Sequence, residues 1–99
     1  MVSGGRLLRA IVRSAQAHGC DAEVALAATR DWGSATFVGA RFDVAVTLAA
    51  GSSAAAWIAA LPEADLPMPR QFARDIRVIA RDDPDEPIRL VLEVLVLED

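Results

Sequence analysis

The residues best suited to chemistry in this sequence are His18 and Cys20, its only imidazole and its only thiol, which are separated by one glycine. A thiol beside an imidazole can act as a nucleophile activated by a general base. Such a site needs a third group that orients the base, and no residue near this pair holds that position. Gly19 and His18 instead fit the end of a helix, where glycine adopts the left-handed conformation and a cation meets the negative helix end. We therefore predict no catalytic residue here.

The other polar clusters also have simpler interpretations than a ligand site. A structural zinc site needs four ligands, mostly Cys and His, and this chain has one of each. The acidic stretch 82–87 lacks the glycine and the spacing of a calcium loop, and its two prolines favour a hairpin turn. The glycines at 4–5 and at 51 do not have the spacing of a phosphate-binding loop. We expect no metal and no cofactor, and we favour a protein that is not an enzyme.

Composition indicates one small domain spanning residues 1–99. The net charge of −4 argues against nucleic acid, whose phosphates call for a basic surface. The ten basic residues are all Arg, which suggests a GC-rich bacterial genome. A single cysteine fits the reducing cytoplasm, and no apolar run is long enough to span a membrane.

Residues 1–20 contain no acidic residue and have two interpretations. The triplet at 15–17, Ala-Gln-Ala, resembles the cleavage site of a signal peptide, but Arg9 and Arg13 interrupt the apolar centre that such a peptide needs. We prefer an amphipathic helix over residues 5–18. Its expected buried stripe has helical spacing, with Leu7 beside it: Leu8, Ile11, Val12 and Ala15.

The stretch 35–48 has the strongest strand character, with alternating large apolar residues from Phe42 to Leu48. Gly39 interrupts the pattern, which predicts a β-bulge at that position. A preceding strand is expected over 23–29, joined by a turn at 30–34. Trp32 lies in this predicted turn, where it either folds over the sheet edge or serves as an exposed anchor for a partner.

The second half of the chain predicts one helix and two strands. Residues 54–61 form a short helix that begins after a serine cap, packs through Trp57 and ends at Pro62. A stiff, proline-rich connector covers 62–69, and a strand follows over 72–81. The last strand, 88–97, is apolar on both faces, which is typical of a central strand.

These elements predict an α+β fold, a two-layer sandwich with a four-stranded mixed sheet and two helices on one face. The order αββαββ allows the last strand to fill the gap left by a right-handed crossover, so that the sheet order is 1-2-4-3. This layout resembles a ferredoxin-like sheet whose first strand has been moved to the C-terminus, and layout alone carries no function. A meander, 1-2-3-4, is the alternative order.

Two helices can cover only one face of such a sheet, so we expect the other face to be open. The last strand nonetheless places apolar residues there, and large apolar patches usually mark an interface. We predict a non-catalytic interaction module that forms a homodimer or binds a protein partner. Its expected interface residues are Val91, Leu95, Leu97, Ile79 and Trp32. The alternative is a small-molecule sensor or a small enzyme, with a pocket between the sheet and the connector at 62–69.

Overall fold

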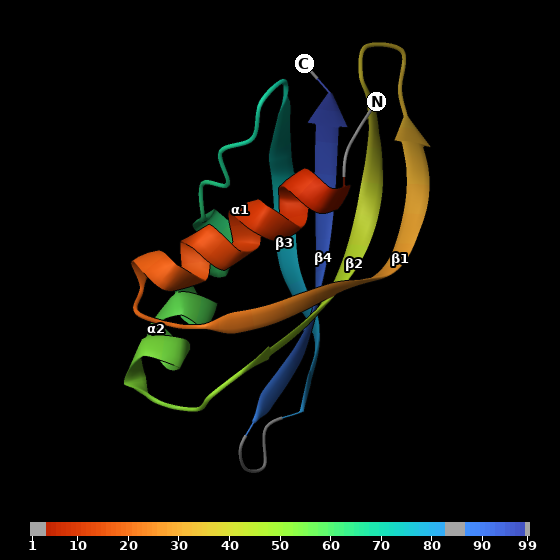
Figure 1. Ribbon diagram of the computed structural model, residues 1–99. Helices are drawn as coiled ribbons and strands as arrows, with labels where there is room; N and C mark the ends of the chain where they lie inside the picture. The colour runs from red at the N-terminus through yellow and green to blue at the C-terminus, as the bar shows by residue number, and fades with distance from the viewer. Residues whose placement is uncertain (1–3, 83–86, 99) are drawn as a thin grey trace.

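The computed structural model describes residues 4–82 and 87–98. The elements follow the predicted order of helix, two strands, helix and two strands, with one short 3-10 helix added (Figure 1). Their bounds are α1 Gly4–Ala17, β1 Ala22–Gly33, β2 Val38–Leu48, α2 Ser52–Ala60, η1 Leu61–Glu63, β3 Gln71–Asp82 and β4 Ile88–Glu98.

The four strands form one sheet in the order β1-β2-β4-β3, which confirms the predicted arrangement over the meander. β2 and β3 run in the same direction, as the crossover requires, but β4 lies between them and is antiparallel to both. Every hydrogen-bonded pair is therefore antiparallel, so the sheet is antiparallel and not mixed as the sequence predicts.

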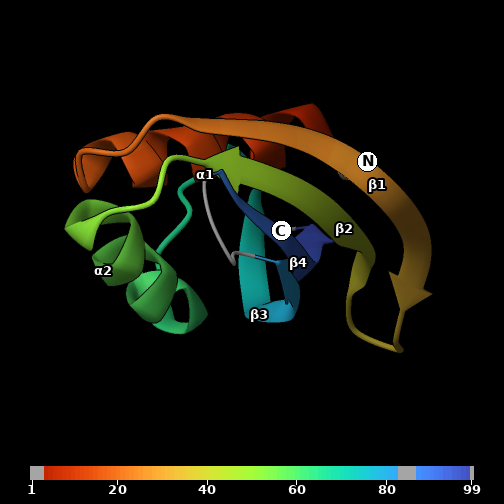
Figure 2. The same cartoon turned by 90° about the horizontal axis from the view of Figure 1, so that it is seen from below.

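Both helices lie on one face of this curved sheet and give the two-layer sandwich (Figure 2). Trp57 of α2 is fully buried, and its indole Nε1 donates a hydrogen bond to Ser14 Oγ of α1 at 3.0 Å. The two helices are therefore joined by a large apolar side chain whose polar atom is satisfied. The rest of the core comes mainly from both helices, the inward side chains of β2 and β4, Ile76 of β3, and Leu61 and Leu66 after α2.

The hairpin between β1 and β2 differs from the prediction because its loop lies later in the chain. Residues 30–33 continue β1, and the loop spans 34–37. Ser34 builds this loop: its amide donates to Phe37 O at 2.9 Å, and its hydroxyl accepts from the Phe37 amide at 3.1 Å. Trp32 is therefore a strand residue opposite Gly39 and not a turn residue.

The predicted bulge at Gly39 is wrong, because Gly39 pairs in register with both Trp32 and Leu97. The irregularity lies in β1 instead, where Ala27 is skipped between Leu26 and Ala28. Two neighbouring alanines leave no mark on the alternating pattern, so this bulge is invisible in the sequence. The extra residue moves Ala28 from the helix-facing side of the sheet to the other side.

The central position predicted for β4 is confirmed, since β4 pairs with β2 on one side and with β3 on the other. β3 carries two bulges, where Arg74 and Ile79 are skipped in the pairing with β4. The connector packs on the body of the protein, with Leu66 buried and Met68 half-buried, and Arg6 donates to Pro69 O at 3.0 Å.

Candidate functional site

The pair His18 and Cys20 ends a helix and does not form a nucleophile and its base. Gly19 has φ of 80°, the left-handed conformation predicted for the helix end. The His18 ring contacts Ser14 O through Nδ1 at 3.2 Å, and the Cys20 thiol contacts the backbone carbonyl of His18, at 3.9 Å, rather than its ring. Cys20 is buried, and no group here prepares it as a nucleophile.

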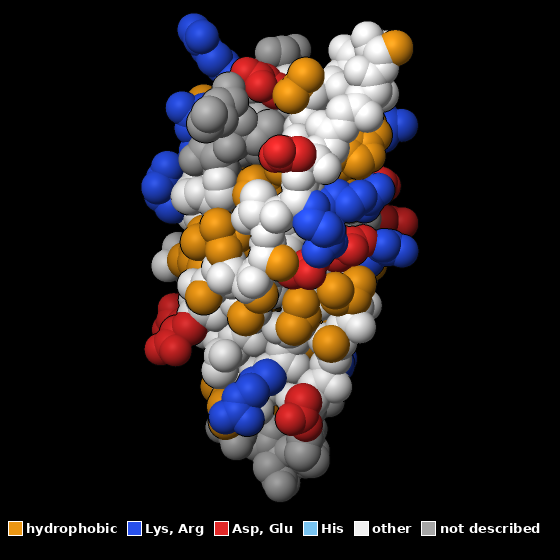
Figure 3. All heavy atoms as spheres, turned by 90° about the vertical axis from the view of Figure 1, so that its right-hand side faces the viewer, with side chains coloured by type: hydrophobic (Ala, Val, Ile, Leu, Met, Phe, Trp, Pro, Cys, Tyr) orange, Lys and Arg blue, Asp and Glu red, His pale blue; other side chains and the backbone are white. Residues whose placement is uncertain are grey.

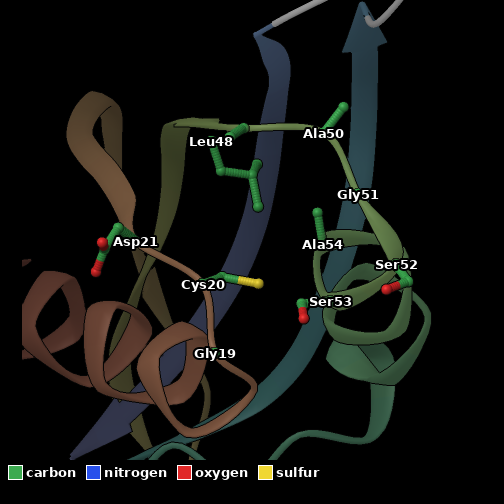
Figure 4. A pocket seen from close by; sticks show the side chains of 10 residues that line it. Gly19, Cys20, Asp21, Leu48, Ala50, Gly51, Ser52, Ser53 and Ala54 are labelled. Carbon is green, nitrogen blue, oxygen red and sulfur yellow. The ribbon is translucent and has the colours of Figure 1, made fainter.

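A cavity of about 400 Å³ lies beside Cys20, where the loop after β2 enters α2 (Figure 4). Ser52 and Ser53 line it, but neither side chain caps α2, so the predicted serine cap is wrong. Gly51 holds the cap position with φ of 153°. The walls are mostly backbone and small side chains: Gly19, Cys20, Asp21, Leu48, Ala49, Ala50, Gly51, Ser52, Ser53 and Ala54. The cavity brings together no convergent charged or aromatic groups of the kind that orient a substrate.

A second cavity, of about 240 Å³, lies beside the connector. It is formed by α1 with Asp65 and Pro67. The pocket beside the connector therefore lies against α1, whereas the sequence-based prediction places it against the sheet. Within residues 4–82 and 87–98, no three His, Cys, Asp or Glu side chains are grouped to hold a metal ion. The acidic stretch that we predict as a turn lies largely outside the described residues, at 83–86.

The five predicted interface residues do not form one exposed patch. Leu95 and Leu97 are 4% and 1% exposed within the single chain, so the expectation of an open face at these positions is wrong. Trp32 and Val91 are half-buried. Ile79 alone is well exposed, at 47%, as the bulge residue of β3.

The outer face of the sheet, which no helix covers, is closed over Leu97 by residues far apart in sequence. Leu97 lies between Gly39 and Phe72 in the register of the sheet. A Cβ at Gly39 would lie 2.9 Å from Leu97 Cδ2, so the leucine side chain occupies the space that glycine leaves. The ring of Phe37, from the β1–β2 loop, meets the ring of Phe72 on β3. These contacts explain how Leu97 is buried without a helix or a second copy.

The centre of the outer face holds a cluster of charged side chains, one or more from each strand. Glu93 of β4, whose side chain is 14% exposed, accepts from Arg30 of β1 at 3.1 Å and from Arg77 of β3. Arg41 of β2 lies 3.5 Å from the same carboxylate. Arg30 also donates to both carboxylate oxygens of Asp43 at 3.1 Å. The hydrogen bonds that Arg30 donates to Asp43, together with the negative charge of Asp43, raise the pKa of Arg30; Glu93 raises the pKa of Arg77 in the same way.

This charge cluster limits what the outer face can bind. Its carboxylates are already paired with arginines, so the cluster links the four strands through ion pairs and leaves no carboxylate free for a ligand. Beyond it, at the β3–β4 hairpin end, small side chains leave a shallow apolar hollow of about 300 Å³ around Ala45, Ala80 and Val91. Of the predicted interface, only Val91 and Ile79 lie at this end of the sheet.

A different apolar surface lies on the opposite edge, between α1 and β1. The buried residues of α1 are Leu7, Ala10, Ile11 and Ala15, whereas Leu8 and Val12, both predicted as core, are half-buried. Leu8 and Val12 line a groove of about 340 Å³ with Val24 of β1, and its remaining walls are Arg9, Arg13 and Gln16. We call this surface, together with the adjoining strand edge 22–27, the β1-edge groove.

The β1-edge groove lies at the border of the sheet, because α1 runs alongside the first half of β1 and β1 is an edge strand (Figures 1 and 2). Figure 3 shows the molecule from the side on which β1 lies, where hydrophobic side chains lie across the middle of the surface beside a group of basic and acidic side chains. No residue of β1 is buried, and Leu26 is 42% exposed. The sequence signal for this surface is the apolar stripe of α1, which includes Leu8 and Val12 in addition to the helix residues that the sheet buries.

Comparison with protein-family models and with curated proteins finds no match. No helix among the described residues is long and apolar enough to cross a membrane.

Proposed function

We propose that this protein is a non-catalytic interaction module that binds an extended segment as an additional strand beside β1. The observation that supports this most directly is the apolar flank of α1, Leu8 and Val12, which overhangs the free edge of the sheet. Strands added to a sheet edge gain main-chain hydrogen bonds for affinity and side-chain pockets for specificity.

The two edges of the sheet differ in how well they are protected against such pairing. Bulges and charged residues are the usual protections of an edge strand. β3 has both, with bulges at Arg74 and Ile79 and five charged residues between 74 and 82. The first part of β1, residues 22–27, reads Ala-Glu-Val-Ala-Leu-Ala and carries only Glu23 as a charge. Its bulge lies at the end of this segment, at Ala27, so 22–26 is regular and open.

The overhang of α1 supplies the second half of the site. A strand added to β1 would lie about 4.8 Å beyond it. An α-helix with its side chains is about 10–12 Å across, so the outer flank of α1 reaches over that position. Side chains of the added strand that point toward the helices would then meet Leu8 and Val12. This burial removes from water the part of the α1 stripe that the sheet leaves half-exposed.

The proposal differs from a dimer formed through the outer face. That dimer depended on Leu95 and Leu97 as exposed residues, and both are buried in the single chain. The remaining apolar hollow, around Ala45, Ala80 and Val91, is shallow and borders the charge cluster on Glu93. The outer face therefore supports a dimer less well than the β1 edge supports an added strand.

The small-molecule alternative has a less favourable site. The cavity beside Cys20 has a volume in the range of ligand pockets, about 400 Å³, but small and backbone groups form most of its walls. A polar ligand would find the amides at the start of α2 and little else to fix its orientation.

The test is peptide selection followed by amide hydrogen exchange. A library of random dodecapeptides displayed on phage is selected on the full chain, and the bound complex is then compared with the free protein. We expect selected peptides to slow exchange of the amides at 22–27 and to shift the methyl resonances of Leu8 and Val12. Binding that protects the Cys20 cavity instead would favour the small-molecule alternative, and failure to select any peptide would contradict the proposal.

A further inference from the structure

We propose that the partner segment of the β1-edge groove is acidic: an extended stretch of another protein that combines apolar side chains with carboxylates. This inference rests on the proposed function and adds the chemistry of the partner to it.

The charge of the groove is opposite to that of the whole chain. The protein carries a net charge of −4, whereas α1 contains three arginines and no acidic residue. Arg9 and Arg13 both line the groove and are exposed. Within residues 4–82 and 87–98 neither makes an ion pair or a side-chain hydrogen bond, in contrast to Arg30, Arg41 and Arg77 on the outer face. Carboxylates on a partner would supply the missing counter-charge.

The spacing of the groove residues matches that of a strand. Leu8 and Val12 are four residues apart on α1, as are Arg9 and Arg13, so each pair is separated along the helix by about 6 Å. Side chains on one face of a strand repeat every two residues, about 6.6 Å. Because α1 runs alongside the first half of β1 (Figure 1), successive groove-facing residues of an added strand can meet successive turns of the helix.

A second copy of this chain fits the groove less well. In a two-fold pairing of β1 with its symmetry mate, each α1 lies over its own β1, so the two helices become neighbours across the new strand pair. Arg9 and Arg13 of both copies would then gather in one place. Glu23, the single acid of the edge segment, pairs with Thr47 on the outer face, away from α1. Like charges brought together in this way oppose association.

The experiment uses the phage selection above and reads the charge of the selected peptides. We expect them to carry net negative charge with apolar residues at alternating positions. The double variant Arg9→Glu with Arg13→Glu should bind these peptides at least about tenfold more weakly, and selection on that variant should yield basic peptides. Arg74→Glu is the matched control, since it makes the same kind of change at an exposed residue on the opposite edge. It should leave peptide affinity unchanged. Circular dichroism establishes that each variant is folded.

The outcomes separate this inference from the proposed function. Peptides that protect 22–27 from exchange but show no acidic preference would overturn the inference and leave the function standing. Absence of any protection at 22–27 would overturn both. A wild-type dimer that protects the same amides would identify a second copy as the occupant and contradict the inference. Binding to vesicles of phosphatidylcholine and phosphatidylserine, with no peptide selected, would also contradict it.

Discussion

The rings of Phe37 and Phe72 meet edge to face, with centroids 6.3 Å apart and planes at 85°. Phe37 belongs to the loop between β1 and β2, and Phe72 belongs to β3 at the opposite edge of the sheet. The contact therefore joins two segments that are not neighbours in the sheet, across the end of β4. It closes the part of the outer face where Leu97 is 1% exposed.

We expect Phe37 and Phe72 to be energetically coupled. A double-mutant cycle with Phe37→Ala and Phe72→Ala should give a coupling free energy of about 0.5–1.5 kcal/mol, the usual value for an aromatic pair. The measurement is the free energy of unfolding from urea titrations of the four proteins. Strictly additive losses would show that the two rings do not support each other.

Gly39→Ala should be strongly destabilising because the position has no room for a side chain. An added Cβ would lie 2.2 Å from Val96 O and 2.9 Å from Leu97 Cδ2, and the former is backbone that cannot rotate away. Overpacking of this kind costs about 1–3 kcal/mol or more. Gly33→Ala is the control, since its nearest neighbour would be Phe37 O at 4.0 Å. Equal losses from the two substitutions in urea titrations would contradict the proposed close packing.

Trp57→Ala should cost about 3–5 kcal/mol of unfolding free energy, because a fully buried aromatic side chain is lost. Trp57→Phe keeps most of the ring but removes the hydrogen bond to Ser14 Oγ, and should cost less. Ser14→Ala, which leaves the indole N–H without its partner, tests the same bond from the other side. A loss below about 1 kcal/mol for Trp57→Ala would mean that the residue is not an anchor of α2.

Leu95→Arg should destabilise the monomer by placing an unpaired charge at a position that is 4% exposed. Ile79→Arg introduces the same side chain on the neighbouring strand, at a residue that is 47% exposed, and should be tolerated. Thermal unfolding followed by circular dichroism compares the two. If Leu95→Arg leaves the melting temperature unchanged, the outer face is open there, as the sequence alone had suggested.

Glu93→Gln should weaken the sheet more than Asp75→Asn, because Glu93 contacts arginines from three other strands. The carboxylates raise the pKa of Arg30 and Arg77 above the ordinary value of arginine. Because these arginine pKa values are raised in the folded state, the ion pairs add to the free energy of unfolding at every pH below the unfolded-state pKa. This addition is lost only as the pH rises through the folded-state pKa, at strongly alkaline pH. The stability difference between wild type and Glu93→Gln should thus stay constant around neutral pH. It should shrink as salt screens these partly exposed pairs.

The sheet order could be predicted because it depends on strong local signals. β4 has apolar residues on both faces, which is typical of a central strand. The sequence predicts the hairpin loop too early in the chain, because Asp31 and Gly33 are typical turn residues, whereas the loop is fixed by hydrogen bonds to the Ser34 hydroxyl. Local composition does not tell which of two adjacent turn-forming segments the strand pairing will use.

The surfaces could not be predicted because they depend on contacts between distant segments. The sequence pattern predicts that Leu97 is exposed, because it does not show that Phe37 and Phe72 meet at the same end of the sheet. Leu95 is buried between Arg41 and Asp75 of the two neighbouring strands. The sequence pattern predicts Leu8 and Val12 as core residues. They are only half-buried because α1 lies over the edge strand and not over the middle of the sheet. Periodicity identifies which residues of a helix are apolar, but the packing angle decides which of them are covered.

The position of β4 also constrains the order in which this protein can be assembled. β4 joins β2 to β3, yet it follows both in the chain, and β2 and β3 share no strand pairing of their own. A nascent chain that has reached only residue 82 can form the β1–β2 hairpin, but the apolar inner edge of β2 has no partner on the side that β4 will occupy. Sheets that depend on such non-local pairings fold slowly, in milliseconds to seconds. The unfinished protein therefore exposes a Val-rich strand edge during synthesis, and this is the stage at which chaperone binding would matter most.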